Sequence, residues 1–322
     1  MKKALMIMLL AAIALPLFAD DALVLPAQVL RVYVAPTYAF ADKAYDADGK
    51  LQDISFGPMT AKVSLFDLGF AAEYGVTDWL TAAVQWAPGW TLSSKIDLSP
   101  TSPFFPADYN VNGVNDIFAG AKIQILGAKG LVENKVMRLA LAPGVKLPMP
   151  DVDWDKQSQN LGAGKDATLL SLAKHAWGVG ARAYFDYVIN NMFFINLYSE
   201  YIMYFKRTNV EYDLSLAKAD LEYGYDLTLE VEPHFTYMIA DGMQIGAGLP
   251  VTYAMNPKLK VDGTAIDDTD GYTLSLSPNV SLFLMKFFLP LEIKASYGFP
   301  LMGKNSFAIN NLTVQVKAYL KF

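Results

Sequence analysis

Apolar and polar residues alternate along most of the chain with a period of two residues, which is typical of β-strands. Twelve segments follow this pattern, at 28–41, 59–76, 79–91, 114–126, 136–147, 169–188, 192–207, 223–238, 243–255, 272–287, 291–300 and 307–322. Because successive side chains of a strand point to opposite sides of a sheet, each predicted strand has one apolar face and one face that carries its polar residues.

The connections between the predicted strands alternate in length. Short ones occur at Thr77-Asp78, 127–135, Asn190-Asn191, 240–242 and 288–290. Long ones occur at 42–58, 92–113, 148–168, 208–222 and 256–271, and a shorter sixth at 301–306. Bacterial membrane barrels have an even number of strands, short periplasmic turns and longer extracellular loops. We therefore predict an all-β fold, a transmembrane antiparallel up-and-down β-barrel of about 12 strands; a soluble barrel is the structural alternative.

The composition favours the membrane barrel. Of 322 residues, 53% are apolar and only 18% are charged, whereas soluble proteins carry about 25% charged residues. The mean hydropathy is +0.23. Beyond residue 19 no apolar run approaches the roughly 18 residues that a membrane helix needs, so the apolar residues must cross a membrane as strands.

The N-terminus indicates export. Met1-Lys2-Lys3 is basic, residues 4–15 are apolar, and we expect cleavage after Ala19. Residues 1–19 are then a signal peptide, 20–27 a short periplasmic segment and 28–322 a barrel in the outer membrane. Loss of Lys2 and Lys3 changes the net charge from −6 to −8, so no basic surface for nucleic acid is expected. The chain has no cysteine, which excludes disulfides and thiolate metal sites.

Charged residues identify the face of each strand that points into the barrel, because a cation facing lipid at mid-membrane costs roughly 2–4 kcal/mol. In 223–238 the apolar face carries Leu227, Leu229 and Val231, while the opposite face carries the densest polar group of the chain. The main lumen candidates are Arg138, Lys146, Arg182, Glu200, Asp226, Glu230, Glu232 and His234. Acids and bases are balanced on this face, so a lattice of ion pairs and a solute site are both open interpretations.

The last strand has the apolar face Leu312, Val314, Val316, Ala318, Leu320 and Phe322. A terminal phenylalanine in such a strand resembles the C-terminal signal of bacterial outer-membrane barrels. The resemblance implies that the barrel-assembly machinery recognises this strand, with Tyr319, Leu320 and Phe322 as the candidate signal residues.

Three internal stretches resemble one family. They are 73–81 (EYGVTDWLT), 115–122 (NDIFAGAK) and 139–148 (LALAPGVKLP). They are similar to stretches of the phenol meta-pathway (MetA) outer-membrane proteins, which are grouped with the FadL-type transporters of hydrophobic compounds. The sequence departs from the family pattern at Asn115, Pro143 and 149–151. Only residues 20–27 precede the first strand, so the N-terminal plug of FadL barrels is not carried over.

Five prolines lie within predicted strands, at positions 36, 143, 233, 250 and 278. A strand proline removes one hydrogen-bond donor of the ladder. One of them, with Pro143, Pro233 and Pro278 as the main candidates, could mark a wall gap for lateral exit of an apolar solute, as in FadL-type barrels. Ordinary bulges or strand ends explain them equally well.

The function that we predict is passive diffusion of small solutes, hydrophobic or aromatic ones included, through an outer-membrane channel. No Ser lies beside His234 in its strand, and no zinc-protease motif or P-loop occurs, so we expect neither an enzyme nor a cofactor. The expected partners are outer-membrane lipid, the assembly machinery and the solute. The alternative is a surface scaffold, an adhesin or antigen, whose loops 92–113, 148–168 and 256–271 bind a partner. The oligomeric state is left open.

Overall fold

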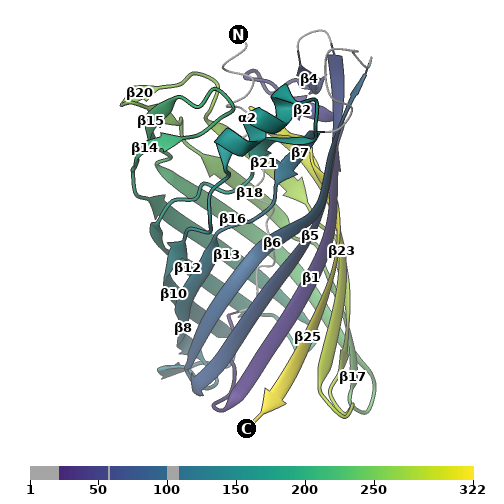
Figure 1. Ribbon diagram of the computed structural model, residues 1–322. Coiled ribbons are helices and arrows are strands. Elements are labelled where there is room, and N and C mark those ends of the chain that lie inside the picture. Colours follow the sequence, from purple (N-terminus) through teal and green to yellow (C-terminus); the bar gives the residue numbers. More distant parts are fainter. Residues whose placement is uncertain (1–21, 57–58, 100–108) are drawn as a thin grey trace.

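A closed antiparallel barrel of 12 strands forms the body of the molecule (Figure 1). The computed structural model describes residues 22–56, 59–99 and 109–322. The barrel strands are β1 (Val29–Ala41), β5 (Met59–Thr77), β6 (Leu80–Ser99), β8 (Ile117–Gly127), β10 (Met137–Leu147), β12 (Gly178–Val188), β13 (Phe193–Tyr204), β16 (Tyr225–Ala240), β17 and β18 (Met243–Gly248, Val251–Asn256), β21 and β22 (Gly271–Leu276, Asn279–Leu284), β23 (Leu291–Lys304) and β25 (Asn310–Lys321).

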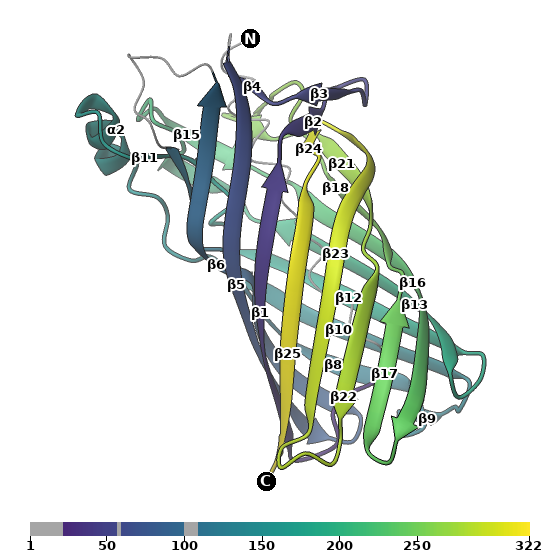
Figure 2. The ribbon, with the colours of Figure 1, turned by 90° about the vertical axis from the view of Figure 1, so that its right-hand side faces the viewer.

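The first and last strands close the barrel. Val34 of β1 lies opposite Phe70 of β5 on one side and opposite Val316 of β25 on the other. Figure 2 shows β1 and β25 side by side, with the C-terminus at the end of the barrel where the turns are short. Closure pairs the edge strands, which a membrane requires because lipid offers no hydrogen bonds. The predicted fold class is therefore confirmed.

Several strand ends differ from the prediction. β6 continues to Ser99 through part of the predicted loop 92–113, and β23 continues to Lys304. β12 begins at Gly178 rather than 169, because the residues before it form extracellular structure. The predicted strands 243–255 and 272–287 are each split in two, at Pro250 and Pro278.

Short elements cover the extracellular end of the barrel. β2 (Lys43–Tyr45), β3 (Leu51–Asp53) and β24 (Ser306–Phe307) form one small sheet, and β14 (Arg207–Glu211), β15 (Lys218–Glu222), β19 (Lys260–Val261) and β20 (Thr264–Ala265) form another. β4 (Ser55–Phe56) extends β5, β7 (Tyr109–Asn112) pairs with β11 (Ala167–Ser171), and β9 (Val132–Glu133) pairs with β8 near a short turn. Helix α2 (Trp154–Gly162) is capped by Asp153. Among the described helices, none is long and apolar enough to span a membrane.

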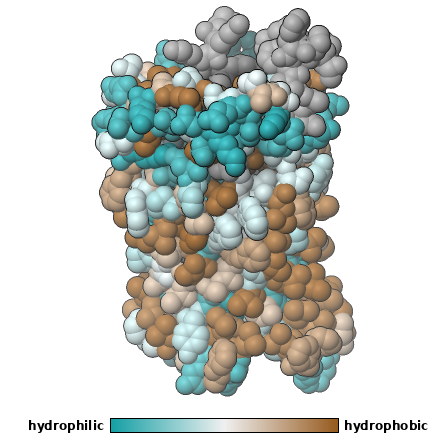
Figure 3. Space-filling view, in the orientation of Figure 1, coloured by the Kyte–Doolittle hydropathy of each residue, from teal (hydrophilic) through white to brown (hydrophobic). Residues whose placement is uncertain are grey.

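The polarity of β5 reverses along its length. Towards the periplasmic end, Phe66, Phe70 and Tyr74 face outward and are partly exposed, while Asp67 and Glu73 are buried inside. Towards the extracellular end, Ala61, Val63 and Leu65 are buried inside, and the outward positions are Thr60, Lys62 and Ser64. Figure 3 shows the same division, with a hydrophobic lower surface below a hydrophilic upper zone. The barrel therefore projects beyond the apolar zone that lipid would cover.

Candidate functional site: the barrel lumen

A chain of charged and polar side chains crosses the lumen between opposite walls. Arg31 of β1 pairs with Glu73 of β5, and the Gln85 amide donates to Glu73 over 3.0 Å. Arg182 of β12 donates to the Gln85 side-chain oxygen and pairs with Glu200 of β13. The Arg182 guanidinium also lies 3.8 Å from the centroid of the Phe118 ring. We call this group, with Tyr198, whose hydroxyl donates to Glu200, the lumen belt.

Two other predicted lumen residues lie near the lumen belt. Arg138 of β10 forms a 3.4 Å ion pair with Asp186 of β12, which lies directly opposite in the ladder. Lys146 of β10 is partly buried, and its charge acts on Glu200 through space. The ion pairs therefore join neighbouring strands on the inner face of the wall, and most of the charge of these residues is neutralised by pairing.

The residues before β1 lie inside the lumen. We call residues 22–28 the N-terminal segment. The Ala22 backbone N–H donates to both carboxylate oxygens of Asp186, each at 3.2 Å, and the Gln124 amide donates to the Ala22 carbonyl. Ala22 is fully buried against Ala140, Ala142 and Tyr184. The segment expected to lie in the periplasm instead occupies barrel space, because the lumen carboxylate at Asp186 satisfies its backbone.

The lower part of the N-terminal segment is fixed to the β5–β6 turn. The Leu25 N–H donates to the Thr81 hydroxyl over 2.9 Å, and the Ala27 N–H donates to the Asp78 carboxylate over 3.1 Å. The Ala27 N–H, followed by Lys129, lowers the pKa of Asp78 in this turn. Gly75 leaves room for the segment, because a Cβ at this position would lie 2.0 Å from the Pro26 carbonyl oxygen.

The predicted polar group on β16 divides into two environments. Glu230 and Glu232 are buried, at 6% and 4% exposure. Glu230 accepts a 2.6 Å hydrogen bond from Thr252, while Glu232 accepts one from Asn279 at 3.0 Å and contacts His234 Nδ1 at 3.2 Å. Asp226 lies higher, where it pairs with Lys174 and accepts a hydrogen bond from the Tyr204 hydroxyl over 2.8 Å. These groups hold neighbouring strands and a loop together.

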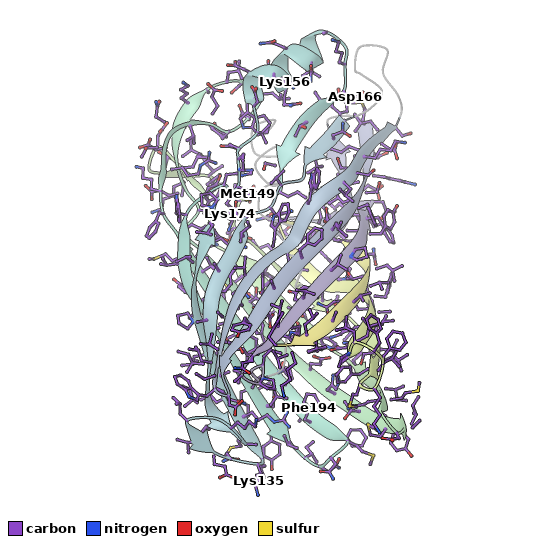
Figure 4. The ribbon with its side chains drawn as sticks, turned by 60° about the horizontal axis from the view of Figure 1, so that its bottom comes forward. Lys135, Met149, Lys156, Asp166, Lys174 and Phe194 are labelled. Carbon is purple, nitrogen blue, oxygen red and sulfur yellow. The ribbon has the colours of Figure 1, made fainter. Side chains whose placement is uncertain are left out.

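The extracellular loop between β10 and β12 folds back onto the barrel. His175 Nδ1 lies 3.0 Å from the Met149 carbonyl oxygen, and the Met149 N–H donates to Asp116. Lys174, next to His175, lies 4.3 Å from the Tyr204 ring centroid. Figure 4 shows Met149 and Lys174 close together below Lys156 and Asp166, which belong to α2 and the loop after it. These contacts hold the loop across the upper end of the barrel.

The same loop contains a Ser–His contact that the sequence did not indicate. Ser171 Oγ lies 2.7 Å from His175 Nε2, and Asp116 Oδ1 lies 4.0 Å from His175 Nδ1. Ser171 is only 3% exposed, and the nearer partner of Nδ1 is a backbone carbonyl rather than the carboxylate. A nucleophile must reach its substrate and its base must be oriented by a third group, so this arrangement stabilises the loop.

Two apolar clusters lie at the extracellular end of the described barrel. One gathers Ile96, Tyr109 and Phe307 with the inward residues at the top of β1 and β5, and Leu161 packs against it. The other gathers Leu221, Tyr223 and Leu259 under the β14–β15–β19–β20 sheet. Ile96 and Leu221 are fully buried. The extracellular end is therefore packed like a small protein core.

Three of the strand prolines lie side by side in the wall. Pro233 of β16 accepts from the Leu249 N–H at 3.2 Å, Pro250 from Ser277 at 3.0 Å and Pro278 from Tyr297 at 3.1 Å. Each proline keeps this acceptor bond but cannot return a donor. Pro36 and Pro143 lie singly in other parts of the wall. Each is paired on one side, with Leu68 and Ala181, while on the other side the ladders with β25 and β8 skip positions 35–36 and 142–143. We call Pro233, Pro250 and Pro278 the proline row.

A groove lies on the outer surface next to the proline row. Its volume is about 450 Å³, and its lining includes Leu197, Leu229, Val231, Val251 and Leu274. Val231 lies two residues before Pro233, and Val251 directly follows Pro250. The proline row, where three backbone N–H donors are missing from the wall, therefore lies next to an apolar external surface.

A second cavity, which we call the lower cavity, occupies the lumen below the lumen belt. Its volume is about 640 Å³, and it lies between residues 23–25 of the N-terminal segment and the walls formed by β13, β16, β17, β22, β23 and β25. Glu232, His234 and Tyr319 line it. Figure 4 shows two other lining residues, Phe194 and, nearer the bottom, Lys135.

The C-terminal strand lies against β1 in the wall. Thr313, Gln315 and Lys317 are buried, whereas Leu312 and Val314 are exposed, so the two faces of β25 are separated as the alternation predicts. The Tyr319 hydroxyl donates to Glu292 over 2.9 Å. Leu320 lies opposite Leu30 of β1, and the Phe322 side chain is 72% exposed.

Comparison with known proteins shows the fold. No protein-family model matches the chain, and no curated protein matches it in sequence. Among solved structures it is similar to the COG4313 outer membrane channel from Pseudomonas putida F1, with a TM-score of 0.68 and 16% identity over 94% of this chain and 100% of that chain. A Pseudomonas aeruginosa FadL homologue aligns with a TM-score of 0.35 and 13% identity, over 91% of this chain and 90% of that one. The first of these matches agrees with the class that the barrel itself defines, a transmembrane β-barrel.

Proposed function

We propose that this protein is an outer-membrane channel that lets small hydrophobic or aromatic solutes pass through the wall of the barrel. The observation that carries the proposal is the proline row, where three neighbouring strands each lack a backbone donor beside an apolar external groove. Fewer ladder bonds make strand separation less costly there than elsewhere in the wall. The channel activity stated for the similarly folded Pseudomonas putida protein agrees with this proposal.

The interior argues against a wide aqueous pore. Apolar clusters pack at the extracellular end, the lumen belt links β1 to β13 across the interior, and the N-terminal segment occupies part of the lumen. A porin interior needs a polar, water-filled path. A solute that enters from outside must displace loop contacts such as Lys174–Asp226 and then leave beside Pro233, Pro250 and Pro278.

Uptake of a neutral aromatic solute tests the proposal. Bare phospholipid passes such solutes by itself, so we suggest outer-membrane vesicles with a lipopolysaccharide leaflet, prepared with and without the protein. We expect faster entry of labelled toluene with the protein, and no faster entry of a sugar of similar size. Equal toluene entry in both preparations would exclude the channel.

A scaffold function is the second candidate. The small sheet β14–β15–β19–β20 stands on its own apolar cluster at the extracellular end, as a binding platform would. Vesicles that show no solute entry would favour it. Insertion by the barrel-assembly machinery, with Tyr319, Leu320 and Phe322 as its signal, is part of both proposals.

A further inference from the structure

The lower cavity has more cationic than anionic lining. Among its described lining residues, five are bases (Arg31, Lys135, Arg138, Lys294 and Lys317) and two are acids (Glu232 and Glu292). Three of these bases are engaged by acids: Arg31 by Glu73, Arg138 by Asp186 and Lys317 by Glu292 at 3.4 Å. Two bases, Lys135 and Lys294, then remain against one acid, Glu232, and account for the excess of positive charge.

Lys294 is the cation available within the cavity. Among the described residues, no ion pair within 4 Å includes Lys294, although its charge acts on the Glu230 and Glu232 carboxylates at longer range. The nearest acids are already held, because Glu232 is bound by Asn279 and His234, and Glu230 by Thr252. Lys135, by contrast, is exposed in a periplasmic turn. A partly buried ammonium group with no ion-pair partner favours an anion beside it.

The register places a second cation near Lys294. Lys317 lies opposite Glu292, two residues from Lys294 on the same face of β23. Diagonal neighbours of this kind lie about 7–8 Å apart between strands. One carboxylate can therefore approach both ammonium groups, and Glu292 shares Lys317 with it.

Aromatic rings adjoin these lysines. Phe283 of β22 lies opposite Glu292, and its ring centroid is 5.5 Å from that of Tyr319. On the other side of the cavity, Phe194 stacks on His234 with centroids 4.6 Å apart. Flat apolar walls beside a cation suit a planar aromatic ring that carries a negative charge. His234 is also next to Pro233, so the cavity reaches the inner side of the proline row.

We infer that the lower cavity binds an aromatic monocarboxylate, with its carboxylate at Lys294 and Lys317 and its ring against Phe283 and Tyr319. This inference rests on the proposed function and names a substrate class for the same path. The carboxylate supplies a direct ion-pair contact, which Lys294 does not make with any acid of the described residues, and the ring replaces water on an apolar surface. A neutral aromatic molecule gains only the second contribution.

Direct binding tests the inference on the full chain in a non-ionic detergent. The probe is benzoate, with the neutral isostere benzamide for comparison, followed by calorimetry or ligand-observed NMR. We expect Lys294→Gln to weaken benzoate binding by about tenfold, the usual effect of losing a hydrogen bond to a charged group. The matched control is Lys304→Gln, because Lys304 carries the same charge on the same strand, pairs with Asp270 and does not line the cavity. It should leave benzoate affinity unchanged.

The outcomes separate this inference from the proposed function. Benzoate binding no tighter than benzamide binding, or equal weakening by Lys294→Gln and Lys304→Gln, overturns the inference. Toluene entry measured with the Lys294→Gln protein shows whether that variant is folded and inserted. If toluene enters and benzoate does not bind, the carboxylate site is wrong and the channel stands; if benzoate binds and toluene does not enter, only the proposed route is wrong.

Discussion

At the scale of single residues, small side chains and buried carboxylates place the N-terminal segment. Asp186 is fully buried, accepts from Ala22 and from Asn196, and faces Arg138. The alternation of the sequence places Asp186 inside the barrel. It cannot show that the backbone N–H of Ala22, 164 positions away in the chain, will donate a hydrogen bond to this carboxylate. Residues 22–28 carry no strand period of their own, so their position follows from the complementary lumen surface alone.

Gly75→Ala tests that position. The new Cβ would lie 2.0 Å from the Pro26 carbonyl oxygen and 2.8 Å from that of Leu25, so the N-terminal segment must move. The chain has no cysteine, and a spin label at Leu23→Cys therefore reports on the segment alone. We expect Gly75→Ala to increase the mobility of the label and to raise ion conductance in planar bilayers.

The matched control is Gly162→Ala in the same labelled background. Gly162 ends α2, and a Cβ there meets nothing within 4 Å. It should change neither label mobility nor conductance. An immobile label in the Gly75→Ala protein would show that the segment is not held against β5.

At the scale of elements, the strands were predictable because each carries its own period of two residues. The shortened prediction for β6 has a physical cause: a transmembrane strand is expected to carry its apolar face outward. In β6 the alternation continues to Ser99, but Ile96 faces inward while Lys95 and Asp97 face outward and pair at 2.5 Å. Beyond the lipid, water surrounds the barrel and the apolar cluster lies inside it. The outward positions of the strand are therefore polar, and this segment of the sequence resembles a loop. The breaks at Pro250 and Pro278 were visible as prolines, whereas their alignment with Pro233 depends on register.

The inversion in β5 predicts where lipid ends. Phe70 faces outward in the apolar zone, and Ser64 faces outward above the inversion. We expect Phe70→Arg to lower the free energy of unfolding by about 2–4 kcal/mol, the cost of arginine near the bilayer midplane. Ser64→Arg, which places the same cation on the same face of the same strand, should change it by less than about 1 kcal/mol. Folding in lipid vesicles with a denaturant titration measures both, and equal losses would contradict the boundary.

At the scale of the whole molecule, three features narrow the barrel interior, and one stretch of its wall has fewer backbone hydrogen bonds. Apolar clusters pack at the extracellular end, the lumen belt links opposite walls, and the N-terminal segment occupies part of the lumen. The sequence predicts a balance of acids and bases in the lumen, but it does not predict which side chains pair. Arg182, for example, donates to Gln85, which lies 97 positions away in the chain. The wall lacks backbone donors at three adjacent prolines. This combination suits an apolar solute that leaves sideways into lipid.

The most direct test is a covalent lock across the proline row. Val251 and Leu276 lie opposite each other on β18 and β21, directly beside Pro250, and opposed strand residues have the Cα spacing that a disulfide needs. Oxidation of the Val251→Cys, Leu276→Cys protein should stop toluene entry into outer-membrane vesicles, and reduction should restore it. The same lock between Val179 and Met203, on β12 and β13 away from the row, should have no effect. Toluene entry that continues at the reduced-state rate when the first pair is fully oxidised would contradict exit through the wall.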